Sequence, residues 1–302
     1  MLDNPLGDLS RAVLCTVAYA DIFDYPLTAL EVHRYLTGVS APLDAVNQAL
    51  EGRLFMRIGD YYTLPGREEI VSIRKQREAR SRKLMRRAIQ YGRILGALPY
   101  VRMVALTGSL AVLNVSNAVD FDYMLVTARG RLWTARAFAV AFNRLTRLHG
   151  YTLCPNLIIS ENALEWPQHD LYSARELCQM VLITGEEVYS RLMQANPWVG
   201  ALLPNAFMNS GGLSSKPRER APALQSLFER PLRGVLGDRL EAWEMNRKIA
   251  RLTRQYGYGE ETIFIADVCQ GNFDHHRSWT YAALEKRLAK FKVKSPLPMG
   301  EG

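Results

Sequence analysis

The sequence predicts an α+β protein made of four consecutive parts. Three observations predict it: short helical patterns and a hairpin signal at the amino end, a strand-helix-strand alternation in the centre, and helical periodicity beyond it. With 302 residues and 48% hydrophobic content, the chain is long enough for about two or three domains. We place the parts at residues 1–66, 67–98, 99–165 and 166–302.

Residues 1–66 have the pattern of a winged-helix-like module. Thr28 is placed to cap the second of three short helices, and Gly59-Asp60 separates two strand-like runs. In a winged helix the third helix usually enters the DNA major groove. Here the segment 41–52 is poor in basic residues and carries Asp44, Asn47, Gln48 and Glu51. Two interpretations stay open for this module: DNA binding, or packing against its neighbour or a partner.

Residues 67–98 predict one long connecting helix, because the segment has no proline and many strong helix formers. It is also strongly basic. The basic residues are Arg67, Arg74, Lys75, Arg77, Arg80, Arg82, Lys83, Arg86, Arg87 and Arg93. The whole chain has a net charge of +8, which favours polyanionic partners. The arginines could line a nucleic-acid or triphosphate groove, or form a solvated face.

The centre of the chain predicts the α+β core, residues 99–165. Two apolar strands are separated by a short helix, and a longer amphipathic helix leads to a third strand. The expected elements are 101–106, 109–113, 121–127, 131–149 and 153–160.

A glycine and a serine stand at the first turn of this core, directly after the strand 101–106. Gly108 lets the backbone approach a ligand closely, and the free N–H groups at the following helix start can point at an anion. The hydroxyl of Ser109 adds a donor. Serine is also a common helix cap, so this pair alone fits a purely structural role.

Two carboxylates stand at the start of the second strand. Asp120 and Asp122 are two residues apart, so their side chains project to the same face while Phe121 turns to the other. Two neighbouring carboxylates repel each other unless a cation lies between them, and Mg²⁺ is the usual partner where phosphate oxygens complete the shell. We therefore expect Asp120 and Asp122 to bind a metal, although a solvated strand start is the simpler alternative.

The combination is more specific than its parts. A Gly-Ser pair after a strand, followed eleven residues later by Asp-x-Asp running into Tyr123-Met-Leu-Val126, resembles the signature of the DNA polymerase β-like nucleotidyltransferase superfamily. The resemblance covers Tyr100 to Ser160, about a fifth of the chain. It implies a nucleotidyltransferase fold in which Gly108 and Ser109 hold the triphosphate while Asp120 and Asp122 bind Mg²⁺ or Mn²⁺.

The third carboxylate of that family is missing from its usual strand. Asn156 occupies the expected position, where it would contribute to nucleotide binding, and Glu161 stands only at the far end of the strand. A neutral amide binds Mg²⁺ less well and cannot act as a general base.

Three functions remain open at this point. The first is an enzyme that transfers a nucleoside monophosphate from a nucleoside triphosphate to an acceptor hydroxyl with release of pyrophosphate. The second is a weak or inactive relative that binds nucleotide, and possibly DNA, as a regulator. The third is an antitoxin-like nucleotidyltransferase that modifies a protein. The sequence does not name the acceptor; nucleic acid could bind through the amino-terminal module or the basic helix.

The remainder, 166–302, predicts a helical carboxy-terminal domain with a mobile loop near 208–222. No apolar run approaches the roughly 18 residues that a bilayer span requires, and the four cysteines show no metal or disulfide spacing. We expect a cytoplasmic protein with no membrane partner.

Overall fold

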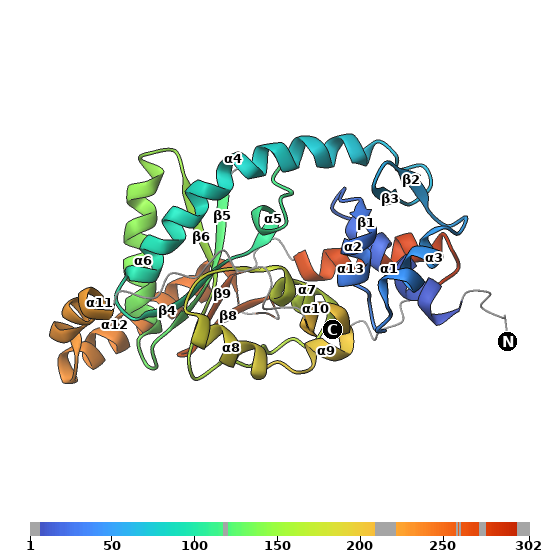
Figure 1. Cartoon of the computed structure of the whole chain (residues 1–302). Helices are drawn as coiled ribbons and strands as arrows, with labels where there is room; N and C mark the ends of the chain where they lie inside the picture. Colours follow the sequence, from blue (N-terminus) through green and yellow to red (C-terminus); the bar gives the residue numbers. More distant parts are fainter. Residues whose placement is uncertain are drawn as a thin grey trace.

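The computed structural model of the chain describes residues 7–116, 120–208, 222–257, 259, 261–271 and 276–294. A module at the amino end lies beside a larger part built on one central sheet, and helix α4 runs along both (Figure 1). The α+β class predicted from the sequence is confirmed. The loop expected near 208–222 falls on residues 209–221, which lie outside the described residues.

The amino-terminal module contains the three helices and the hairpin expected from the sequence. Thr28 caps α2 as predicted, with Glu31 completing a reciprocal capping box. A two-residue strand before α2 adds a third strand to the hairpin, in the order β1-β3-β2. The elements are α1 (Asp8–Asp21), β1 (Leu27–Thr28), α2 (Ala29–Arg34), α3 (Leu43–Leu50), β2 (Met56–Ile58) and β3 (Tyr61–Thr63).

The connecting helix α4 (Ile70–Ala97) is 28 residues long, or about 42 Å. It packs against strands β4 (Val101–Leu106) and β7 (Val181–Thr184). Two glycines allow the close approach: a Cβ on Gly92 would collide with Ile183, and one on Gly96 would lie 2.6 Å from Thr184 Oγ1. The helix therefore fixes the module to the sheet.

The central sheet has six strands in the order β7-β4-β5-β6-β9-β8. The pair β5 (Asp120–Thr127) and β6 (Thr152–Ser160) is parallel, because helix α6 (Leu132–Arg147) makes the crossover between them, and the other pairs are antiparallel. Short helix α5 (Gly108–Ala111) connects β4 to β5. Strands β8 (Thr262–Phe264) and β9 (Val268–Gly271) form the edge beyond β6.

Alternation along β5 divides the sheet into two faces. Tyr123 and Leu125 belong to a core shared with α4 and α6, and the Tyr123 hydroxyl donates to the Ala88 carbonyl of α4. Met124 and Val126 belong to a second core, which also includes α7 (Leu171–Gln179) and the amino-terminal module. Asp120 and Asp122 are an even number of residues from Met124 and Val126 on the same strand, so they project to the same face, the one covered by α7.

The expectation of a separate helical domain over 166–302 is corrected by the sheet. Strands β7, β8 and β9 come from this region and join the strands of residues 99–165 in one sheet. Each has only three or four residues, too few to show a strand period. The helices here are α7, α8 (Glu186–Gln194), α9 (Val199–Leu202), α10 (Pro204–Met208), α11 (Pro222–Glu229), η2 (Arg230–Leu232), α12 (Val235–Tyr256) and α13 (His276–Ala289).

Among the described helices, none combines the length and the apolar character that a bilayer crossing would need.

Candidate functional site

The predicted site residues lie where β4 ends and β5 begins. Leu106 pairs with Tyr123 in the antiparallel ladder, and the N–H of Thr107 donates to the carbonyl of Asp122 at 2.9 Å. The turn that carries Gly108 is therefore held directly beside the start of β5.

Gly108 is in close contact with the carboxyl group of Asp122. Its φ of +65° is a left-handed conformation that favours glycine. A Cβ at this position would lie 3.1 Å from the carboxyl carbon of Asp122 and still closer to Oδ2. Ser109, the next residue, has an exposed side chain. The structure thus brings the Gly-Ser turn and the second aspartate together, as the resemblance implies.

The two aspartates differ in environment. Asp120 is exposed, whereas Asp122 is half-buried. Burial raises the pKa of Asp122 to about 6; the hydrogen bond from Asn156 lowers it, and the negative charge of Asp120 raises it further. When Asp122 is deprotonated, its carboxylate is poorly solvated, and a bound cation would stabilise its negative charge.

Asn156 reaches the aspartate pair because β6 bulges at this point. Tyr123 pairs with Pro155 and Met124 with Leu157, so Asn156 is the extra residue between them. Its Nδ2 donates to Asp122 Oδ1 at 2.8 Å. The position expected for the third carboxylate is therefore at the site, and it holds a hydrogen-bond donor.

Glu161, the other acidic residue considered for that role, is not at the site. It lies five residues further along the chain from Asn156, about 17 Å at the usual strand rise. There it forms an ion pair with Arg191 of α8.

A third carboxylate that the sequence motifs did not indicate is Glu176 of α7. Burial raises its pKa to about 7, and the negative charge of Asp122 raises it as well, so the two carboxylates interact across the sheet face. Glu176 stands next to Leu177 and Cys178, both buried. In the sequence, the only sign that Glu176 could belong to the site is that an acidic residue stands beside the apolar face of a helix.

The carboxylate oxygens of Asp120 and Asp122 suit a hard cation that also binds phosphate. No cluster of three or more His, Cys, Asp or Glu side chains able to hold a metal occurs among the described residues. Mg²⁺ is commonly bound by one or two carboxylates with water and substrate phosphates completing its shell, and Asp120 and Asp122 supply that number. They could hold Mg²⁺ or Mn²⁺ together with a nucleotide, and less readily a metal alone.

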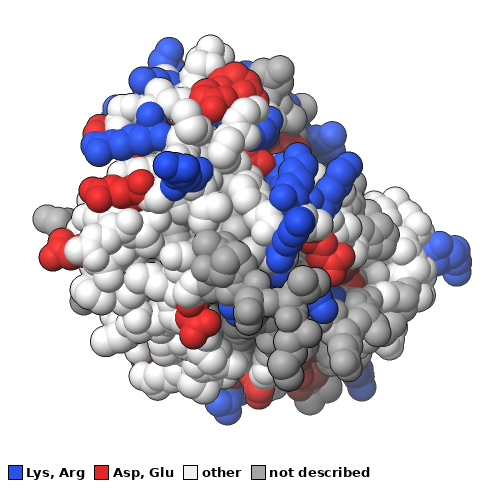
Figure 2. Space-filling view, turned by 90° about the vertical axis from the view of Figure 1, so that its right-hand side faces the viewer, with Lys and Arg blue, Asp and Glu red and all other residues white. Residues whose placement is uncertain are grey.

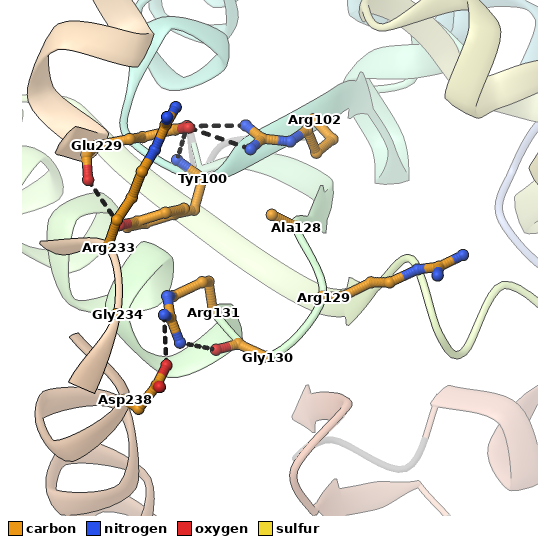
Figure 3. Close-up of a pocket in the computed structure, with 10 residues that line it drawn as sticks. All are labelled: Tyr100, Arg102, Ala128, Arg129, Gly130, Arg131, Glu229, Arg233, Gly234 and Asp238. Atoms are coloured by element: carbon orange, nitrogen blue, oxygen red, sulfur yellow. Dashed lines mark hydrogen bonds and ion pairs between the residues drawn. The ribbon is translucent and has the colours of Figure 1, made fainter.

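An open pocket of about 560 Å³ lies elsewhere, between β4, the turn before α6 and the start of α12 (Figure 3). Its carboxylates are already paired. Glu229 bonds Arg102 at 2.8 Å, and Asp238 bonds Arg131 at 2.5 Å. Figure 3 shows Arg129 pointing away from these pairs. The paired groups connect the α11 to α12 hairpin to the sheet, and none of the predicted site residues lines this pocket.

We compared the chain with protein-family models, with curated proteins and with solved structures, and none of the three comparisons gave a match.

Proposed function

We propose that the chain is a metal-dependent nucleotidyltransferase whose site is formed by Gly108, Ser109, Asp120, Asp122 and Asn156. The observation that carries the proposal is the short distance between the Gly108 turn and the Asp122 carboxyl group, since a Cβ on Gly108 would lie 3.1 Å from the carboxyl carbon. A turn that can receive phosphates and a carboxylate pair that can hold a cation are thereby placed side by side.

In the proposed reaction an acceptor hydroxyl attacks the α-phosphorus of a nucleoside triphosphate in line with the bond to the β-phosphate. The new oxygen-phosphorus bond forms as that bond breaks, and pyrophosphate leaves. Gly108 and Ser109 position the β- and γ-phosphates, and Asp120 and Asp122 bind the metal. Bound Mg²⁺ would stabilise charge on the attacking and leaving oxygens.

The proton of the acceptor hydroxyl needs a base, and Asn156 cannot supply one. Glu176 comes from α7, which packs on the same face of the sheet, and both burial and the charge of Asp122 raise its pKa. It is the candidate proton acceptor that substitution can test. The hydrogen bond from Asn156 would orient Asp122 instead.

A second candidate function follows from the same asparagine. Without a carboxylate at position 156, the site could bind a nucleotide and a metal but turn over weakly or not at all, as a regulator does. Substitutions at positions 156 and 176 distinguish the active enzyme from the regulator. Asn156→Asp should raise turnover if that position is the third ligand, and unchanged turnover together with loss of activity in Glu176→Gln would assign the base to α7.

The test is label transfer. The chain is incubated with Mg²⁺ and each of the four nucleoside triphosphates, labelled at the α- or the γ-phosphate, in the presence of candidate acceptors. The acceptors are a small alcohol, a sugar, protein and nucleic acid. The enzyme predicts transfer from the α-labelled nucleotide only, and a regulator predicts Mg²⁺-dependent binding without transfer.

A matched pair of variants assigns the activity to the site. Asp120→Ala with Asp122→Ala should abolish transfer and nucleotide binding. Asp44→Ala with Glu51→Ala makes the same charge change at two exposed positions in and just after α3, and should leave both unchanged. Tight nucleic-acid binding with no Mg²⁺-dependent nucleotide binding would rule the enzyme out.

A further inference from the structure

Helix α4 carries as much net charge as the whole protein. Its 28 residues include nine basic side chains and one acidic one, a net charge of +8, which equals the net charge of the 302-residue chain. The rest of the molecule is therefore neutral overall. Such a concentration of positive charge on a single helix can be met by internal partners, by solvent or by an external polyanion.

Internal partners account for the arginines on the inner side of the helix. Arg74 is buried and bonds Glu31 of α2 at 2.7 Å, and Arg77 bonds Asp24 at 3.3 Å. Both carboxylates belong to the amino-terminal module. These two arginines hold the module on α4 and are not available to a ligand.

The outer side of α4 is different. We call the following exposed residues the basic face of α4: Lys75, Arg82, Lys83, Arg86 and Arg93. Among the described residues, only Arg82 of this group is ion-paired, with Glu78 one turn before it. An exposed pair of this kind is worth little, so the basic face remains positive.

The spacing along the basic face fits an extended ligand. Lys75, Arg82 and Arg93 recur at multiples of the helical repeat, within about 20° of one another around the axis. From Lys75 to Arg93 the row is about 27 Å long. A triphosphate contacts only a fraction of that length, whereas one strand of a nucleic-acid duplex presents about eight phosphates over it.

The basic face has little apolar surface. Ile94 is the one large hydrophobic side chain exposed on α4, whereas Leu84, Met85, Ile89 and Leu95 pack into the core on this side of the sheet. Protein interfaces usually need buried apolar or aromatic anchors, and bilayer-surface helices need an apolar side turned outward. Charge without such anchors favours a nucleic-acid backbone.

The amino-terminal module is less suited to the same partner. Helix α3 exposes Asp44 and Gln48, with Glu51 just after it. On the face of the molecule seen in Figure 2, Lys and Arg form separate groups with Asp and Glu among them, and most of the surface is uncharged. A backbone docking there would meet both signs of charge.

We propose that the basic face of α4 binds the phosphate backbone of a nucleic acid without reading its sequence. The helix covers the side of the sheet opposite to Asp120 and Asp122, so this binding does not depend on nucleotide transfer. The proposal and the proposed enzyme activity can therefore fail separately.

The test is fluorescence polarisation of the full chain in EDTA, without nucleotide, using a labelled single-stranded RNA of about 20 uridines and a duplex DNA of similar length. Affinity should fall steeply between about 50 and about 200 mM salt. Lys75→Gln, Lys83→Gln, Arg86→Gln and Arg93→Gln together should weaken binding roughly tenfold or more and reduce the salt slope by about three.

A matched control removes the same charge elsewhere. Arg230→Gln, Arg239→Gln, Arg251→Gln and Arg254→Gln change four exposed arginines of η2 and α12. This variant should bind within a factor of about two of the unmodified chain, because only screened long-range attraction is lost. Circular dichroism confirms that both variants fold.

Three results would overturn the proposal. One is no binding of either nucleic acid at low salt, and another is equal loss in the two variants, which would show attraction by net charge alone. The third is equal affinity for a polyglutamate of similar length, which would point to an acidic protein partner.

Discussion

At the scale of single residues, both the geometry and the charge of the proposed site depend on Asp122. Gly108 contacts its carboxyl group, Asn156 donates to it, and its own carbonyl accepts from Thr107. Burial raises the pKa of Asp122 to about 6. A side chain that destabilises the fold when ionised, yet sits in a fixed hydrogen-bonding position, is typical of functional sites.

Replacement of Asp122 should therefore stabilise the protein at neutral pH. Since the pKa is higher in the folded than in the unfolded state, the folded chain binds more protons between about pH 4 and 6, and stability falls as pH rises through that window. Asp122→Asn should raise the free energy of unfolding by about 1 to 3 kcal/mol at about pH 7. Urea denaturation in EDTA measures it.

The gain from Asp122→Asn should shrink as pH falls toward about 4, where the carboxyl group becomes protonated in both states. Asp120→Asn, at the exposed neighbour, is the control and should change stability by less than about 0.5 kcal/mol. If the Asp122→Asn variant were less stable than the unmodified chain at neutral pH, the assigned burial would be contradicted.

Substitution of Gly108 separates backbone strain from contact with Asp122. Gly108→Ala places a Cβ against the carboxyl group, so it should lose Mg²⁺-dependent nucleotide binding and destabilise the fold by more than about 1 kcal/mol. Gly59→Ala is the matched control, because Gly59 has a similar φ of +62° and no atom near its Cβ position. A thermal-shift series with nucleotide and Mg²⁺ compares them.

The Gly59→Ala variant should lose stability through its φ alone and keep nucleotide binding. If Gly108→Ala binds nucleotide as well as Gly59→Ala does, the close approach of the turn to Asp122 has no role in the site.

The residues of the site that could be predicted are those in local motifs. Gly108, Asp120 and Asp122 fall within fifteen residues, and strand parity alone places the two aspartates on one face. Asn156 follows from the resemblance. Glu176 could not be predicted, because it comes from a helix after β6 and meets Asp122 only through the packing of α7 on the sheet.

At the scale of elements, α4 connects the module to the sheet through buried polar contacts. The guanidinium of Arg74 makes two hydrogen bonds to Glu31, and it packs over the rings of Tyr25 and Tyr61. Burial alone would raise the pKa of Glu31, but Arg74 and Thr28 lower it below its usual value. The stability this pair gives is therefore lost as pH falls through that lowered pKa.

Breaking the pair should be costly because it leaves a buried charge. Glu31→Gln should reduce the free energy of unfolding by about 3 kcal/mol, measured by urea denaturation. The control is Glu78→Gln, which removes the partner of exposed Arg82 and should cost about 0.5 kcal/mol or less. Equal effects of the two substitutions would show that the buried pair does not hold the module.

Elements were predictable where they are long or flank a turn signal. The 28-residue α4 is rich in helix formers and the eight-residue β5 contains an apolar run, whereas the three-residue strands β2 and β3 were predictable because they flank Gly59-Asp60. Strands β1, β7, β8 and β9 have two to four residues, and they are defined by the partners they pair with. This is why the sequence predicts only helices in the region after residue 166.

At the scale of the whole molecule, the module, the sheet and the last helix share contacts. Asp21 of α1 is bonded by Arg67 at 2.9 Å and by Arg287 of α13 at 2.6 Å. The Nδ2 of Asn114 donates to the Phe23 carbonyl, and the N–H of Asn114 donates to the Ser109 carbonyl. The module is thereby linked to the turn that carries Gly108 and Ser109, so its docking helps to position the proposed phosphate-binding turn.

The central claim is that this turn and the aspartate pair form one metal-nucleotide site. Isothermal titration calorimetry with a nucleoside triphosphate analogue, in which methylene replaces the α,β-bridging oxygen, tests it most directly. We predict binding in Mg²⁺ and none in EDTA, lost in Asp120→Ala with Asp122→Ala and kept in Asp44→Ala with Glu51→Ala. Equal affinity in Mg²⁺ and in EDTA, or unchanged binding by the Asp120 and Asp122 variant, would contradict the claim.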